Sequence, residues 1–161
     1  VRMFTTVGAT VLAHTTAAGK AILAFAPPEH IEHLYGKRDD LEQLTPRTLT
    51  TVDAFLEDLE RTKRRGYAID NEEHEEGVSC IAAPVLGPGG ISQAAISISA
   101  PTPRIINAET DELGRLLREH AVSASDSYGA RRAGSVRTWA PGRRRSISAS
   151  SSATAMPATS P

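Results

Sequence analysis

Apolar residues recur along the first 128 residues of the chain with two different periods, which predict a mixture of helices and strands. In the helical segments they return every three or four positions, whereas the strand segments are short runs of apolar and β-branched residues bounded by Gly, Pro or Asp. The predicted helices cover residues 17–26, 29–35, 52–65 and 107–128. The predicted strands cover residues 1–8, 67–70, 79–85 and 91–99.

The third predicted helix carries clear signals at both ends. Thr50 and Thr51 both offer caps for its first turn, and the apolar residues Val52, Phe55, Leu56 and Leu59 fall on one face. A basic last turn suits the negative end of the helix dipole, and Gly66 follows it. These signals predict a helix that begins after Thr50 or Thr51 and ends before Gly66.

The last two predicted strands flank residues 86–90, which contain three glycines and one proline. Such a segment predicts a turn, so we expect the two strands to form an antiparallel hairpin. Pro101 and Pro103 are expected to break the sheet, and Asn107 to cap the long helix that follows.

Charge and composition divide the chain into two parts. Residues 1–130 carry 19 acidic and 12 basic residues, whereas the last 31 residues carry six arginines and no acid. An acidic body does not favour contact with nucleic acid. Because residues 130–161 are rich in Ser, Ala, Pro and Arg and lack periodicity, we predict a single domain over residues 1–129 and a disordered tail after it.

Cysteine content and hydropathy help to predict the cellular compartment of the protein. The chain has one cysteine, so it cannot form an internal disulfide. It shows neither a signal peptide nor an apolar run of membrane-spanning length. We therefore predict a cytoplasmic protein.

Small residues follow Thr16 at the start of the first predicted helix. The segment from Ala17 to Lys20 superficially suggests a phosphate-binding loop, but His14 and Ala21 stand where that motif needs Gly and Ser or Thr. Two interpretations stay open. The free N–H groups of the first turn could bind an anion, or the small side chains could serve only close helix–sheet packing.

Three further positions offer polar groups to a ligand. Ser97 and Ser99 lie two apart on a strand, so both hydroxyls face the same side; they could hold a carboxylate or simply face solvent. Asp70 closes a strand and could accept a hydrogen bond from a ligand hydroxyl or act as a plain turn residue.

Neither nucleophilic catalysis nor metal binding finds support in the spacing of residues. Cys80 lies in an apolar strand with no histidine placed to activate it, so we expect an inert buried thiol. The acidic run 72–76 contains His74 but has no second ligand cluster, which predicts a solvated loop. We predict no metal, no cofactor and no catalytic residues.

Four segments, taken in order, resemble one known family. They are residues 14–24, residues 44–70 with Leu-Thr-Pro-Arg-Thr-Leu-Thr at the start and Lys-Arg-Arg-Gly-Tyr-Ala-Ile-Asp at the end, residues 72–85, and residues 95–101. This set resembles the effector-binding domain of IclR-type transcription regulators. The resemblance implies an α+β, GAF-like fold in which helices flank a curved antiparallel sheet. It also implies a sensor of small organic acids that controls transcription through ligand-dependent changes in a homodimer or tetramer.

The resemblance also implies an effector pocket. A helix N-terminus and two serines would clamp a carboxylate, while Asp70 accepts from a ligand hydroxyl and Cys80 forms a wall. The implied effector-binding residues are Met3, Val11, Ala17, Ala18, Asp70, Val78, Cys80, Ser97 and Ser99.

The chain lacks counterparts of two parts of the family's pattern. The N-terminal winged helix-turn-helix is absent, so contact with operator DNA is expected only through that missing domain, and the N-terminal part of the effector domain is expected to be missing as well. Two alternatives stay open beside a sensing domain. One is a free-standing dimerisation module that titrates full-length partners, and the other is a small enzyme that uses Cys80 or Asp70.

Overall fold

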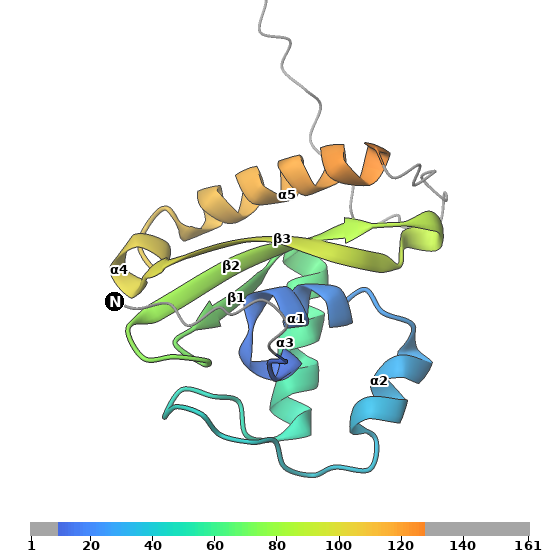
Figure 1. Ribbon diagram of the computed structural model, residues 1–161, viewed down its shortest axis with the longest axis vertical. Coiled ribbons are helices and arrows are strands. Elements are labelled where there is room, and N and C mark those ends of the chain that lie inside the picture. The colour runs from blue at the N-terminus through green and yellow to red at the C-terminus, as the bar shows by residue number, and fades with distance from the viewer. Residues whose placement is uncertain (1–9, 128–161) are drawn as a thin grey trace, which may run out of the picture.

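The computed structural model describes residues 10–127, which fold into helices packed on both faces of an antiparallel sheet (Figure 1). The first predicted strand, Met3 and the predicted tail lie outside the described residues. The α+β class is confirmed. The helices are α1 (Ala17–Leu23), α2 (Pro28–Tyr35), α3 (Val52–Arg65), α4 (Thr102–Ile105) and α5 (Thr110–Ser127), with short 3-10 turns η1 (Ala13–Thr15) and η2 (Pro88–Gly90). The strands are β1 (Ala68–Asn71), β2 (Val78–Leu86) and β3 (Ser92–Pro101).

The strands lie in the order β1-β2-β3, and each neighbouring pair is antiparallel, as the predicted hairpin requires. Figure 1 shows α5 lying along one face of the sheet, with α1 and α3 on the opposite side. The central strand β2 is therefore covered on both faces, which explains why it is almost continuously buried.

Side chains of β2 alternate between these two layers. Ile81, Ala83 and Val85 pack in the cluster that contains Leu117 of α5. Ala82 faces the other way, where it packs with small residues of α1 and β1. Because alanines meet on that side, helix and sheet approach closely, which supports the packing interpretation of the small residues at the start of α1.

Register places three polar side chains in one row across the sheet. Cys80 of β2 is paired with Asp70 of β1 on one side and with Ser99 of β3 on the other. Paired residues share a face, so all three point toward α1. The same register pairs Ser97 with Ala82 and brings both predicted serines to this face.

Some predicted boundaries were wrong. The first helix ends at Leu23, three residues early, because Ala24 already forms its C-cap. The last helix begins at Thr110: the Asn107 side chain accepts from the Glu109 N–H at 2.8 Å and forms a turn before the helix, not its cap. Pro101 ends β3 without breaking it earlier, since it pairs with Val78 at the last ladder position.

Packing between α5 and Tyr67, the residue before β1, makes Gly114 a sensitive position. A Cβ atom added there would lie 2.6 Å from the ring of Tyr67, whose hydroxyl donates to Asp111 at 2.6 Å. Gly114→Ala is therefore expected to lower the free energy of unfolding by about 1–3 kcal/mol, although alanine favours a helix. Urea denaturation measures this, with Arg115→Ala at the next, exposed position expected to stay within about 0.5 kcal/mol. A stabilised Gly114→Ala variant would contradict the packing.

Candidate functional site

A pocket of about 210 Å³ lies between the start of α1 and the sheet. It gathers eight of the nine residues predicted as effector contacts; Met3 lies outside the described residues. Whether they contact an effector stays a prediction. The eight are Val11, Ala17, Ala18, Asp70, Val78, Cys80, Ser97 and Ser99. Three more lining residues were not predicted, namely Thr16, His74 and Glu75.

The N-terminal turn of α1 forms one wall of the pocket. The Thr16 side chain accepts from the Gly19 N–H at 3.1 Å and so caps the helix. The amide groups of Ala17 and Ala18 belong to the same first turn, where a helix offers no carbonyl partner. A polar ligand group at this wall would therefore meet backbone donors over small side chains.

Cys80 and Ser99 form the wall on the sheet. The Cys80 Sγ lies 2.9 Å from the Ser99 Oγ, within hydrogen-bond distance. Burial raises the pKa of the Cys80 thiol to about 11; this value includes the opposing hydrogen bond from Ser99 and a smaller upward contribution from the Asp70 carboxylate. A thiol with such a pKa is protonated at neutral pH, so Cys80 is a poor nucleophile, as predicted. The prediction that it is buried was wrong, because Cys80 lines the pocket and is half-buried.

Asp70, on β1, stands at one end of the row formed with Cys80 and Ser99, and it is 2% exposed. Its Oδ1 accepts from the backbone N–H of Glu73 at 2.7 Å and of His74 at 3.4 Å. Burial raises the pKa of this carboxyl, while those two N–H groups and the charge of Lys20 oppose the shift. Asp70 thus ties the loop after β1 to the strand as well as lining the pocket.

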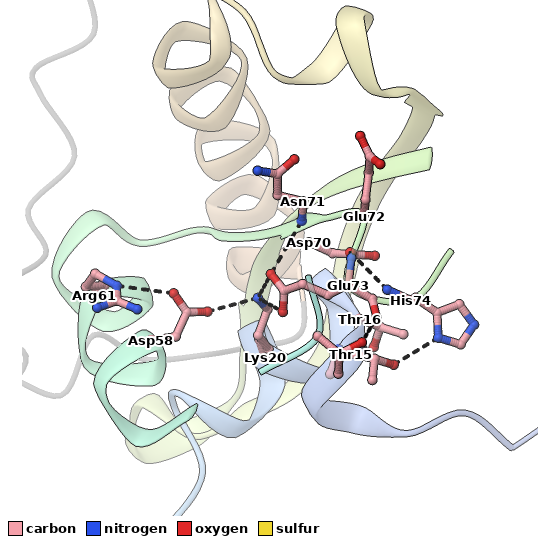
Figure 2. A network of polar contacts seen from close by, with 12 residues as sticks. Thr15, Thr16, Lys20, Asp58, Arg61, Asp70, Asn71, Glu72, Glu73 and His74 are labelled. Atoms are coloured by element: carbon pink, nitrogen blue, oxygen red, sulfur yellow. Dashed lines mark hydrogen bonds and ion pairs between the residues drawn. The ribbon is translucent and has the colours of Figure 1, made fainter. Parts of the chain in front are cut away.

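Figure 2 shows a buried ion-pair cluster formed by Lys20, Asp58 and Glu73, next in sequence to the pocket residue His74. The Lys20 side chain is 0% exposed, and its Nζ lies 2.7 Å from Glu73 Oε1, 2.8 Å from Glu73 Oε2 and 2.9 Å from Asp58 Oδ2. Burial raises the pKa of the Glu73 carboxyl, and Lys20 opposes that shift. The prediction that the acidic run 72–76 is a solvated loop was therefore wrong for Glu73.

Two threonines hold the same loop from its other side. The Thr48 hydroxyl donates to the Glu73 carbonyl at 2.6 Å, and the Thr45 hydroxyl donates to the Glu72 carbonyl at 2.7 Å. Both threonines are buried. Since the loop carries His74 and Glu75, these bonds position one side of the pocket.

The sequence contained signals for some of the residues that were missed. A lysine inside the otherwise apolar segment of α1 must be buried or snorkel to solvent, and burial requires an acidic partner. Nothing local distinguishes Glu73 from its acidic neighbours, because only the tertiary fold brings it to Lys20. Between residues 10 and 127, no group of three His, Cys, Asp or Glu side chains could hold a metal ion.

The sheet, the helices on its two faces and the pocket between them define an α+β domain with a candidate small-molecule site. Residues 1–126 match the family described as "Bacterial transcriptional regulator IclR C-terminal", so the chain belongs to that family. The predicted resemblance is confirmed. In the described part of the chain, no helix combines the length and the apolar character needed to cross a membrane.

Individual relatives agree with this assignment. The chain is 38% identical over 125 residues to the HTH-type transcriptional regulator BhcR of Paracoccus denitrificans, a match covering 78% of this chain and 44% of BhcR. IclR of Thermotoga maritima superposes with a TM-score of 0.73 at 34% identity, covering 80% of this chain and 52% of that chain. The chain spans about half the length of the curated relatives it matches. They are transcription regulators, which agrees with the prediction that the chain is not an enzyme.

A third relative was solved with a bound acid. It is a double mutant of the inducer-binding domain of the PobR transcription factor from Acinetobacter, in complex with 3-hydroxybenzoic acid. It superposes with a TM-score of 0.60 at 33% identity, covering 71% of this chain and 66% of that chain.

The buried cluster yields a test by substitution. Lys20→Met is expected to lower the free energy of unfolding by about 3–5 kcal/mol, because it leaves the Glu73 carboxylate buried without its cation and Asp58 with Arg61 as its remaining partner. Adding Asp58→Asn and Glu73→Gln to Lys20→Met is expected to recover part of that loss. Urea denaturation at pH 7 provides the measurement, with Lys63→Met on the exposed side of α3 as the control. A Lys20→Met variant as stable as the control would refute the role given to the cluster.

The raised pKa of Cys80 gives a kinetic prediction. A thiol with a pKa of about 11 exposes far less thiolate at pH 7.5 than an ordinary cysteine near 8.5. Labelling of the native protein with a thiol reagent is therefore expected to be slower than labelling in urea by roughly two orders of magnitude. Equal rates in the two conditions would show that the thiol is neither buried nor shifted.

Proposed function

We propose that this chain is the effector-sensing domain of a transcription regulator and that its pocket binds a small organic acid. The observation that carries the proposal is the pocket itself, which brings together residues from α1 and all three strands. Its size suits an acid of a few carbon atoms or a single aromatic ring.

The proposed ligand contacts follow from the chemistry of the walls. A carboxylate would accept hydrogen bonds from the first turn of α1 and from the hydroxyls of Ser97 and Ser99 on the facing strand. Asp70 would repel a carboxylate, so it serves better as an acceptor for a hydroxyl or hydrated carbonyl group of the ligand. Cys80 then forms an apolar wall.

Regulation by such a domain requires contacts outside it. We propose a homodimer or tetramer whose contacts change with effector binding, in a cytoplasmic regulator that reaches operator DNA through a winged helix-turn-helix. The PobR inducer-binding domain, which was solved with 3-hydroxybenzoic acid, supports an acid as the class of ligand.

A thermal-unfolding screen tests the ligand class. Glyoxylate, pyruvate and 3-hydroxybenzoate are compared with neutral analogues of the same shape, such as 3-hydroxybenzamide. A ligand at about 100 times its Kd stabilises the folded state by about 2.7 kcal/mol, so at least one acid should raise the unfolding midpoint by several degrees while its amide does not. Stabilisation by amides alone, or by none of the compounds, would refute the proposal.

Ser97 offers a direct test of the clamp. Ser97→Ala is expected to weaken acid binding by about tenfold, because one hydrogen bond to a charged group is lost, and to leave the unliganded unfolding midpoint unchanged. Ser92→Ala on the same strand, outside the pocket, is the matched control and should bind as the wild type does. Isothermal titration calorimetry measures both. Equal affinities for the two variants would place the acid elsewhere.

A further inference from the structure

The acidic residues of the pocket lie at one end of it. Asp70, on β1, and Glu75, on the loop that joins β1 to β2, both line the pocket. Ser97 and Ser99 line it from β3. Because β2 separates β1 from β3 (Figure 1) and neighbouring strands lie about 5 Å apart, the row from Asp70 through Cys80 to Ser99 spans about 10 Å. The pocket therefore has hydroxyl groups at one end and carboxylates at the other.

The backbone around Glu75 is fixed, while its side chain is free to act on a ligand. Its carbonyl accepts from the Val78 N–H at 3.3 Å, which closes a turn. Two residues earlier, the Glu73 carbonyl accepts from Thr48 at 2.6 Å, and its N–H donates to Asp70 at 2.7 Å. In the described part of the chain, no hydrogen bond or ion pair engages the Glu75 side chain itself. Its negative charge is therefore held beside the pocket without a partner that neutralises it.

Both carboxylates act on the same part of the pocket. Burial is the main cause of the raised pKa of the Cys80 thiol, and the Asp70 and Glu75 carboxylates add to it. The described residues that line the pocket include no lysine or arginine to offset these charges. Lys20 is 0% exposed and already paired with two other carboxylates. His74 adds an imidazole, which is not a permanent cation in the way that a lysine or arginine is.

We propose that the pocket selects acids that carry a single carboxylate, and that Glu75 is the residue that excludes a second one. This inference rests on the proposed function, which places the carboxylate of the ligand at the serines of β3. The far end of the ligand then lies beside Asp70 and Glu75, where a hydroxyl or amide group can donate a hydrogen bond. A second carboxylate there meets two like charges, and repulsion of this kind is how many binding sites reject a wrong ligand.

Pairs of ligands with the same shape test the selection in the wild type. Malonate is compared with malonamate, and isophthalate with 3-carbamoylbenzoate, by isothermal titration calorimetry at pH 8, with pyruvate and 3-hydroxybenzoate as monocarboxylate references. The members of each pair differ by one negative charge. A carboxylate about 5 Å from another carboxylate, at the effective dielectric constant of a protein, should make the diacid bind roughly a hundredfold more weakly than its monoamide.

Glu75→Gln tests the residue directly. The substitution keeps the shape of the side chain and removes its charge, so the affinity for each diacid relative to its monoamide should rise by about tenfold or more. Glu75→Ala is a second uncharged variant and should act in the same direction. Glu76→Gln, on the same loop but exposed and outside the pocket, is the matched control and should keep the ratio of the wild type.

The outcomes separate this inference from the proposed function. If monocarboxylates bind but the monoamides bind no better than the diacids, charge does not set the selection and the inference is wrong. An unchanged ratio in both Glu75 variants would also overturn it, because the exclusion would then not come from Glu75. Failure of pyruvate, 3-hydroxybenzoate and both monoamides to bind at all would instead refute the proposed function.

Discussion

A lysine ammonium group buried without solvent contact constrains the architecture of this domain more than any other single interaction. The Lys20 charge must be neutralised inside the protein, because an isolated buried cation is too costly to keep. Its partners come from α3, through Asp58, and from the loop after β1, through Glu73. Three elements that are distant in sequence are therefore held against one another at a single point. Such a cluster adds little net stability over an apolar core, but it admits few alternative arrangements of these elements.

The pocket and this cluster are built on the same two segments, α1 and the loop after β1. Lys20 is on the helix whose first turn forms one wall, and Glu73 adjoins His74, which forms another. Thr48 and Asp70 bind the backbone of the loop from two sides, so its side chains are held in place before any ligand arrives. A preorganised wall of this kind lowers the conformational entropy that ligand binding would otherwise lose. Stability of the fold and shape of the site thus depend on the same residues.

Local signals in the sequence predicted the elements that local interactions determine. The end of the helix from Val52 to Arg65 was predicted, and its start was predicted to within one residue, because helix caps act locally. The Thr51 side chain accepts from the Ala54 N–H, and Gly66 follows the last turn in the left-handed conformation. Strand alternation alone placed Ser97 and Ser99 on one face. The first residue of α5 was missed, since Asn107 bonds within a turn in a way that resembles a helix cap.

The remaining site residues could not be predicted from the sequence immediately around them. The grouping of Val11, Ala17 and Val78 with the serines came from the family resemblance, and no spacing argument would have produced it. The burial of Glu73 within an acidic run, and the approach of His74 to Thr15, depend on contacts between segments more than 50 residues apart. Periodicity indicates only which face of its own helix or strand a residue occupies, so it cannot predict contacts between segments that are distant in sequence.

The claim that the space between α1 and the sheet is a sensor pocket can be tested residue by residue with NMR. Amide spectra of the isotopically labelled chain would be recorded while 3-hydroxybenzoate, pyruvate or glyoxylate is added. Saturable shifts are expected at the pocket residues, with the exposed face of α3 unchanged; these residues are Ala17, Ala18, His74, Ser97 and Ser99. Shifts confined to that face of α3, or spread without saturation over the surface, would contradict it.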